Sequence, residues 1–280
     1  MSLTMGSGPF GHAPAGAFVP GMVLIEPYPR RMRGLLDGET IVDSSHGQLV
    51  HEPGRLPRCF FPMADVRTDL LVPGPAGVPS AALGESQVWD LRVGDRLVER
   101  AAIAYPAPPP EATRVKDHIA LYWRALDQWY EEDVLAVAHI RDPYHRVDAL
   151  PSSRHVRVSL DGVTLAESDK PVVIYETSLV PRWYFAQSDV RVPLEPSDYR
   201  SWCAYKGEAG YWSLMVGDTP HVNLAWTYHD PRHDASLAKD RVAFFNERVD
   251  VDIDGVREER PGGPWADPDW WRDTTSENDL

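Results

Sequence analysis

Residues 33–67 have the sequence RGLLDGETIVDSSHGQLVHEPGRLPRCFFPMADVR, and residues 157–191 repeat it as RVSLDGVTLAESDKPVVIYETSLVPRWYFAQSDVR. Thirteen of the 35 positions are identical at a constant shift of 124 residues, whereas unrelated sequences agree at about one position in twenty. After the loss of one residue, a shift of 123 pairs Trp89 with Trp212. The sequence therefore predicts two copies of one unit of about 100 residues.

Each copy is predicted to be mainly β. Apolar and polar residues alternate over 156–160, with the period of a half-buried strand. Asp161-Gly162 then supplies a two-residue type I′ turn before a second apolar segment, and Asp37-Gly38 repeats this signal. Two further pairs, which predict second hairpins with type II′ turns, are Gly94-Asp95 and Gly217-Asp218.

A helix is predicted near the C-terminal end of each copy. In the first copy, apolar residues spaced 4, 3, 4 and 3 apart indicate one face of an α-helix; they are Val115, Ile119, Tyr122, Leu126 and Trp129. A shorter version in the second copy includes Leu237, Arg241, Val242 and Phe245. The predicted fold is two similar small antiparallel β domains, related by an approximate twofold axis.

The repeat also predicts the domain organisation. The expected segments are a flexible leader (1–29), a first repeat domain (30–135), a connector (136–153), a second repeat domain (154–257) and an acidic tail (258–280). In the connector, His145 beside Tyr144 and Arg146 fits a pocket between the domains, but a solvated position is the favoured expectation. In the tail, Trp265, Trp270 and Trp271 predict that part of the segment docks on a domain.

Charge and composition exclude several classes of function. The net charge is −14, and residues 250–280 alone carry ten acidic and three basic side chains. This balance argues against nucleic-acid partners and anionic membrane surfaces, and no stretch approaches the 18 or so apolar residues of a membrane span. Cys59 and Cys203 form no Cys-x-x-Cys motif, so we expect neither zinc nor a disulfide. No cofactor motif is present, and we expect a cytoplasmic protein without a cofactor.

Several motifs of the second copy occur in a familiar order. They are Cys203-Ala204-Tyr205-Lys206-Gly207-Glu208-Ala209-Gly210-Tyr211-Trp212, Ala225-Trp226-Thr227-Tyr228 and Val242-Ala243-Phe244-Phe245. They resemble the bacterial family called domain of unknown function 427, and the whole chain resembles its tandem, two-copy form found in actinobacteria. The resemblance implies a small β-tent or barrel-like fold, similar to the ligand-binding domain of cereblon and to methionine sulfoxide reductase B. It implies no securely established activity.

A nucleotidyltransferase label is attached to this family. Such enzymes place a Gly-Ser motif before a pair of metal-binding carboxylates. The run Asp250-x-Asp252-x-Asp254 has no such partner and lies at the start of the acidic tail. A nucleotidyltransferase-like enzyme is therefore the least favoured of the hypotheses for this chain.

Cys203-x-Tyr205-Lys206-Gly207 is the sharpest local motif. A cysteine beside a lysine fits a nucleophile with a lowered pKa, and a lysine among aromatic residues fits anion binding. The alternative is that Cys203 is a small buried packing residue. The first copy has Leu83 in place of Lys206. Since a residue that serves only a ligand can vanish from one copy, we expect the functional site around Lys206.

The other candidate residues are aromatic or charged. Trp226 and Tyr228 are two apart on a predicted strand and so share a face, which fits an aromatic pocket or, alternatively, a core filled by large rings. Glu176 is a possible partner of Lys206, although its recurrence as Glu52 also fits a structural ion pair. The candidate ligand-binding residues are Lys206, Tyr205, Cys203, Trp212, Trp226, Tyr228, Glu176 and Arg182.

Two classes of function remain open. The first is a protein that binds a small molecule, or a cofactorless enzyme, with its pocket in the second repeat. The second is a structural or interaction protein formed by pairing of the two β domains within the chain. An open pocket at Lys206 would favour the first, and a filled core with an exposed apolar patch would favour the second.

Overall fold

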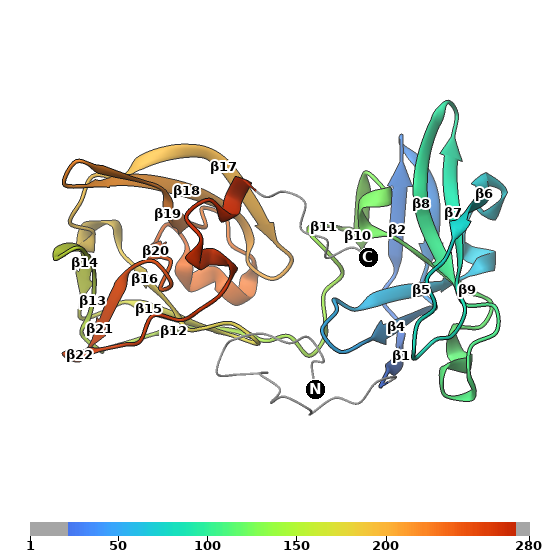
Figure 1. Cartoon of the computed structure of the whole chain (residues 1–280), viewed down its shortest axis with the longest axis horizontal. Coiled ribbons are helices and arrows are strands. Elements are labelled where there is room, and N and C mark those ends of the chain that lie inside the picture. Colours follow the sequence, from blue (N-terminus) through green and yellow to red (C-terminus); the bar gives the residue numbers. More distant parts are fainter. Residues whose placement is uncertain (1–21, 273–280) are drawn as a thin grey trace. The chain divides into compact units, whose positions relative to one another are not determined.

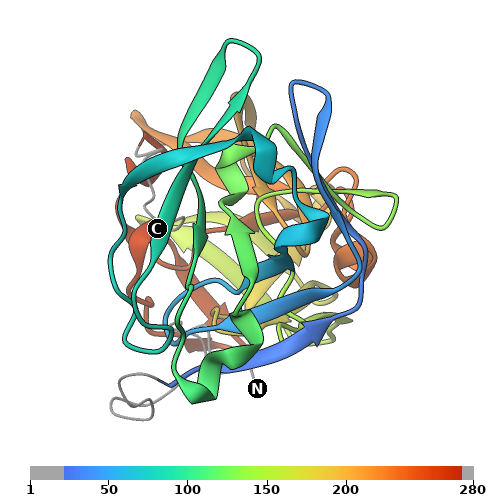
Figure 2. The same ribbon diagram turned by 90° about the vertical axis from the view of Figure 1, so that its right-hand side faces the viewer.

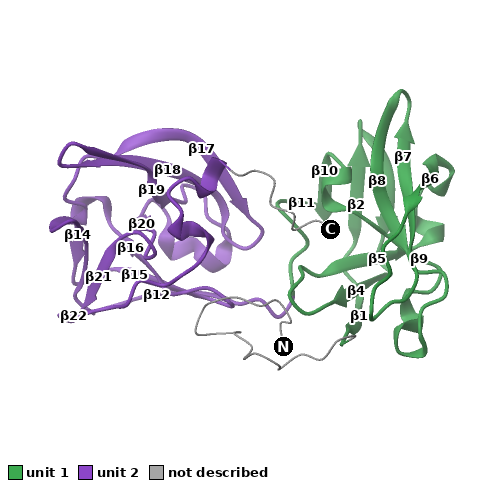
Figure 3. Cartoon of the chain, viewed as in Figure 1, with its two compact units in different colours: residues 1–5, 13–142, 277–280 green, residues 6–12, 143–276 purple. Residues whose placement is uncertain are grey.

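Two compact units make up the part of the chain that the computed structural model describes, residues 22–272 (Figures 1 and 3). Unit 1 comprises residues 22–142 and unit 2 residues 143–272. Each contains one seven-stranded and one four-stranded sheet. Most of the predicted leader, and the end of the predicted acidic tail, lie outside the described residues.

The sheets of unit 1 are antiparallel. The seven-stranded sheet has the order β1 (Leu24–Tyr28), β4 (Gly47–His51), β5 (Arg58–Pro62), β9 (His118–Leu121), β8 (Arg96–Ala104), β7 (Gln87–Val93) and β6 (Leu71–Ala76). The four-stranded sheet has the order β11 (Val134–Ala136), β10 (Gln128–Glu131), β2 (Met32–Leu36) and β3 (Glu39–Ser44). Short 3-10 helices are η1 (Met63–Asp65), η2 (Thr68–Leu70), η3 (Pro110–Val115) and η4 (Trp123–Ala125).

Unit 2 repeats this topology. Its seven-stranded sheet has the order β12 (Val147–Pro151), β15 (Val172–Glu176), β16 (Arg182–Phe185), β20 (Val242–Phe244), β19 (Thr219–Thr227), β18 (Gly207–Val216) and β17 (Glu195–Cys203). Its four-stranded sheet has the order β14 (Val163–Ser168), β13 (Val156–Leu160), β21 (Asp250–Ile253) and β22 (Val256–Arg257). The 3-10 helices are η5 (Gln187–Asp189), η6 (His233–Ala238), η7 (Pro264–Ala266) and η8 (Trp270–Arg272). The prediction of two similar β domains is confirmed.

The predicted hairpins form at equivalent places. Asp37 and Gly38 have φ angles of 51° and 78°, and Asp161 and Gly162 have 50° and 80°, so both pairs form the left-handed corner of a type I′ turn. In the second hairpins, Gly94 has a φ of 56° and its counterpart Gly217 a φ of 58°. The β2–β3 and β7–β8 hairpins both project from one end of unit 1 (Figure 2).

The predicted amphipathic α-helix over 115–129 is wrong. These residues pass from the end of η3 through β9 and η4 into β10. Ile119 and Leu121 of β9 face one core while Ala120 faces the other. A strand buried on both faces carries a continuous apolar segment, whose spacing can imitate that of a helix. The helical element near the end of each repeat is the short 3-10 helix η3 or η6, and residues 242–244 of the second copy form β20.

The N-terminal boundary of each β unit also differs from the predicted one. β1 lies in the segment predicted as leader, and β12 lies in the predicted connector. Each pairs along one side only, with β4 and β15 respectively, at the edge of its seven-stranded sheet. Edge strands tolerate proline, and Pro27 and Pro151 stand in these two. The prolines and short lengths hide both strands from a pattern analysis.

Each unit has two apolar cores, one on each face of its seven-stranded sheet. The inter-sheet core of unit 2 includes Trp183, Phe185, Leu214, Phe244, Val158 and Val251. The second, which we call the outer core, includes Tyr184, Tyr211, Trp226, Tyr228, Ala235 and Ala238. Neighbouring residues such as Trp183 and Tyr184 belong to different cores because successive side chains of a strand point to opposite faces.

The recurring aspartates have structural roles. Ser44 donates a hydrogen bond of 2.6 Å to Asp65, and Ser168 donates one of 2.6 Å to Asp189. Each serine oxygen also accepts a backbone N–H two residues further along the chain, at 3.1 Å and 3.2 Å. Both pairs therefore fix the same corner after the third strand of each copy.

We expect Asp65→Ala and Asp189→Ala to destabilise their own units by similar amounts, about 1–2 kcal/mol each, because each removes the acceptor of the charge-assisted hydrogen bond from Ser44 or Ser168. Calorimetric melting of the two variants is the measurement. Loss of stability from only one of the substitutions would show that the two corners are not equivalent.

Candidate functional site

The candidate site occupies the outer core of unit 2. Tyr184 of β16, Tyr211 of β18 and Trp226 of β19 supply rings from three neighbouring strands. Tyr228 follows β19 on the same face as Trp226, as the spacing predicts. η6 contributes buried Ala235 and Ala238.

Lys206 lies in the turn between β17 and β18, and it is only 9% exposed. Gly207 makes this placement possible, because its φ of 97° is unfavourable for other residues and a Cβ there would lie 3.2 Å from the carbonyl oxygen of Asp230. The backbone carbonyl of Lys206 accepts a hydrogen bond of 3.0 Å from the Arg232 N–H. The turn thus directs a lysine side chain into an aromatic core.

Glu176, at the end of β15, joins Lys206 to a histidine. Lys206 Nζ donates to Glu176 Oε2, and His145 Nε2 lies 3.1 Å from Glu176 Oε1. Burial alone would raise the pKa of Glu176, but the neighbouring Lys206 and the His145 hydrogen bond lower it to about 2. Burial opposes the charge on Lys206, yet the Glu176 carboxylate raises the lysine pKa above its usual value. The pair is therefore ionised at neutral pH.

His145 belongs to this site, and the expectation that it is solvated is wrong. Its side chain is 11% exposed. The imidazole stacks on the ring of Tyr205, with centroids 3.9 Å apart and planes 15° apart. β12 begins two residues later and pairs with β15, so the strand that sequence patterns hide is what brings His145 to Glu176.

The hydroxyls of Tyr184 and Tyr228 remain protonated at neutral pH. Burial raises the pKa of Tyr184 to about 12, although nearby Lys206 partly opposes it, and burial raises the pKa of Tyr228 well above its usual value. Trp226 Nε1 donates a hydrogen bond of 3.2 Å to the Tyr184 hydroxyl. The outer core therefore contains polar groups among large rings.

The equivalent face of unit 1 is largely aliphatic. The residues of unit 2, with their counterparts in parentheses, are Lys206 (Leu83), Tyr205 (Ala82), Tyr184 (Phe60), Tyr211 (Val88), Trp226 (Ile103) and Tyr228 (Tyr105). Leu83 is fully buried. Since both units have the same topology, the fold does not require a lysine at this place.

The recurring glutamate and arginine have different partners in the two units. Glu52 binds Arg58 at 2.6 Å in unit 1. In unit 2 the equivalent Arg182 instead forms a two-pronged pair with Glu247, at 2.6 Å and 2.7 Å. Arg182 also lies over the Trp226 ring, 5.7 Å from its centroid. This change of partner leaves Glu176 available to Lys206 and His145.

The structure separates the other candidates. Tyr205, Trp226 and Tyr228 lie in the outer core, and Cys203 packs against it partly exposed. Trp212 lies on the opposite face of β18, against the inter-sheet core, and donates to Thr227 Oγ1 at 2.8 Å. Tyr184 and Tyr211 belong to the dense aromatic set of the second copy, which fits an aromatic pocket, but the sequence does not single them out as candidate ligand-binding residues. Glu247 is the site residue that the sequence does not indicate at all. For the two tyrosines the missed signal is alternation, because each is the sequence neighbour of an inward-facing tryptophan.

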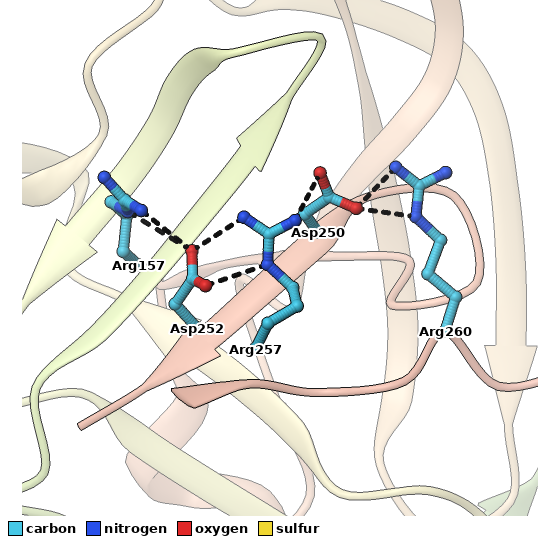
Figure 4. A network of polar contacts seen from close by, with 5 residues as sticks. All are labelled: Arg157, Asp250, Asp252, Arg257 and Arg260. Carbon is cyan, nitrogen blue, oxygen red and sulfur yellow. Dashed lines mark hydrogen bonds and ion pairs between the residues drawn. The ribbon is translucent and has the colours of Figure 1, made fainter. Parts of the chain in front are cut away.

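The acidic run after β20 is neutralised by arginines. Asp250 binds Arg257 and Arg260, and Asp252 binds Arg157 and Arg257, on the four-stranded sheet of unit 2 (Figure 4). A further arginine, Arg154, binds Asp254. Within residues 22–272, no group of three or more histidine, cysteine, aspartate or glutamate side chains is placed to hold a metal ion. The described part of the chain also has no helix with the length and apolar character to cross a membrane.

Comparison with known families agrees with the internal repeat. The profile of the family described as a domain of unknown function (DUF427) matches residues 24–132 and again residues 148–255. The chain therefore belongs to this family as a tandem, two-copy member. Comparison with curated proteins gives no match.

Proposed function

We propose that the chain binds a small molecule, without a cofactor, at the Lys206 cluster of unit 2. The observation that carries this proposal is the buried Lys206–Glu176–His145 cluster at a place where unit 1 has Leu83. Burying charged groups costs free energy that a purely structural core avoids with apolar residues. A function in ligand binding accounts for that cost.

The chemistry of the cluster fits a ligand with a hydrogen-bond acceptor. A lysine ammonium has three donors, and Glu176 is the acceptor that the described structure gives it. The tyrosine hydroxyls of Tyr184 and Tyr228 add groups that both donate and accept. A carbonyl or carboxylate oxygen is the natural complement of Lys206, and the surrounding rings suit a flat body.

We expect Lys206→Leu to abolish ligand binding. The substitution gives unit 2 the residue that unit 1 has at this place, and it removes the ammonium donor. A metabolite library is screened by thermal shift, since a ligand at about 100 times its Kd stabilises the native state by about 2.7 kcal/mol. The compounds that raise the Tm of the wild type should leave the Tm of Lys206→Leu unchanged.

Lys239→Leu is the matched control, because Lys239 is an exposed lysine of the same unit. It should keep every ligand-induced shift of the wild type. If Lys206→Leu also kept them, the site would lie elsewhere, and a function based on pairing of the two β domains would be favoured instead.

We also propose a cytoplasmic location and pairing of the two units within the chain. The two cysteines, Cys59 and Cys203, are both free thiols, as is usual in a reducing compartment. The tandem form that the sequence resembles is actinobacterial. Cell fractionation tests the location, and crosslinking within the monomeric full chain tests the pairing.

A further inference from the structure

The tail of unit 2 is anchored where it leaves the four-stranded sheet. Arg257 of β22 binds both Asp250 and Asp252 of β21, and Arg260 binds Asp250 with contacts of 2.7 Å and 2.9 Å (Figure 4). The backbone N–H of Glu258 donates to the carbonyl of Val251 at 2.9 Å. The chain is therefore fixed as far as Arg260.

A hinge follows the anchor. The sequence from 261 to 264 is Pro-Gly-Gly-Pro. A Cβ at either Gly262 or Gly263 would have no heavy atom within 4 Å, and Gly263 has a φ of 147°. Glycine explores more backbone conformations than any other residue. This pair therefore allows the segment beyond it to move as a body.

Beyond the hinge, the segment 265–271 covers the outer core. Trp270 packs against three rings, with centroid distances of 5.4 Å to Phe245, 5.7 Å to Tyr199 and 5.9 Å to Tyr211. Phe245 in turn lies 4.5 Å from Trp226. Trp270 is thus the outer member of a series of contacting rings that continues through Phe245 and Trp226 to Tyr184, beside Lys206.

The hydrogen bonds of the segment 265–271 are incomplete. Nε1 of Trp270 and Nε1 of Trp271 are buried, yet neither has a hydrogen-bond partner among the described residues. The backbone hydrogen bonds of the segment are local ones between residues three apart, such as the bond of 3.3 Å that the Trp270 N–H donates to the Asp267 carbonyl. A buried donor without an acceptor weakens the docked state. The segment is held by its aromatic rings, including that of Trp265, over which Arg182 lies at 5.6 Å, and by the attraction of Asp267 and Asp269 to Arg248.

From these features we propose that Tyr199, Tyr211 and Phe245 form a subsite for a planar aromatic ring, and that Trp270 is its displaceable occupant. A ligand of the Lys206 cluster with an aromatic ring then competes with Trp270, and residues 264–272 swing away as it binds. This inference rests on the proposed function, because it assigns the outer part of the same site.

Indole, which is the ring system of the Trp270 side chain, is the probe. Trp270 is partly buried, and its truncation uncovers an apolar hollow over Tyr199, Tyr211 and Phe245 that a small aromatic molecule can fill. We expect full-length Trp270→Ala to bind indole at least about tenfold more tightly than the wild type in calorimetric titration. The control Trp202→Ala removes an exposed tryptophan of β17 and should bind indole as the wild type does.

Displacement is tested in the wild-type chain by NMR. The Nε1–H signal of Trp270 is assigned by its absence from Trp270→Phe, a variant that keeps a ring in place. Indole is added to the wild type up to and beyond the concentration that saturates Trp270→Ala. We expect the chemical shift of the Trp270 signal to move toward that of a solvated indole, while the Trp202 signal stays in place.

Two results would overturn the proposal. One is equal indole affinity in Trp270→Ala and Trp202→Ala. The other is a Trp270 signal that does not respond to indole in the wild type, a measurement that does not depend on the folding of the alanine variant. Failure of the proposed function gives a different result. In that case Lys206→Leu keeps all the ligand-induced increases in Tm, and the indole titrations are unchanged.

Discussion

Glu176→Gln should destabilise unit 2 by about 3–5 kcal/mol, because it leaves the Lys206 ammonium buried without its counter-charge. The side chain of Glu176 is 5% exposed, and that of Lys206 is 11% exposed. Glutamine has nearly the same shape as glutamate, so packing changes little. Urea unfolding of unit 2 is the measurement. Glu167→Gln is the control, since Glu167 pairs with His155 at the exposed surface and should cost little.

The same pair predicts a pH dependence. The pKa of Glu176 is about 2 in the folded protein and about 4.3 in an unfolded chain. A lowered folded-state pKa gives stability that is complete above the unfolded value and is lost as the pH falls through the folded value. Wild-type unit 2 should therefore lose stability between about pH 4 and pH 2, and Glu176→Gln should lose less over that range. Equal slopes for the two proteins would contradict the ionised pair.

Glu247→Gln should also destabilise unit 2 by about 3–5 kcal/mol, because it leaves the Arg182 guanidinium unpaired among rings. The two side chains are 2% and 9% exposed, and both oxygens of Glu247 accept hydrogen bonds. Glu208→Gln is the control, because Glu208 forms a long, exposed contact of 3.6 Å with Arg200.

A double variant separates the energy of the Arg182–Glu247 interaction from the other effects of the two substitutions. Arg182→Met combined with Glu247→Leu removes both charges and should recover most of the stability, because an apolar pair of similar size needs no compensation. The coupling energy from this cycle should exceed about 1 kcal/mol for two groups in direct contact. Additive effects of the two substitutions would contradict a direct pair and place the cost elsewhere.

The repeat and its turns could be predicted from the sequence because both depend on local signals. An Asp-Gly pair between apolar segments has few backbone options, and both type I′ turns form where expected. The helix over 115–129 could not be judged locally. β9 is a strand because β5 and β8 lie on either side of it, and partners distant in the sequence decide its conformation.

The candidate site was predictable only in part, for a similar reason. Asymmetry between the copies points to Lys206, and the sequence offers Glu176 as its possible partner. His145 cannot be assigned to the site from the sequence, since it reaches Glu176 only through the pairing of β12 with β15. Glu247 gives no sequence signal, because Arg182 has a different partner from its counterpart in the first copy.

The shared topology of the two units has a consequence for folding kinetics. Adjacent domains of similar sequence can exchange strands while they fold, which is a characteristic error of tandem repeats. Here an exchange of β7 with β18 would force the ring of Tyr211 into the place of Val88, and overpacking of that kind costs about 1–3 kcal/mol. The different residues of the two outer cores therefore disfavour the pairing of a strand with the sheet of the other unit.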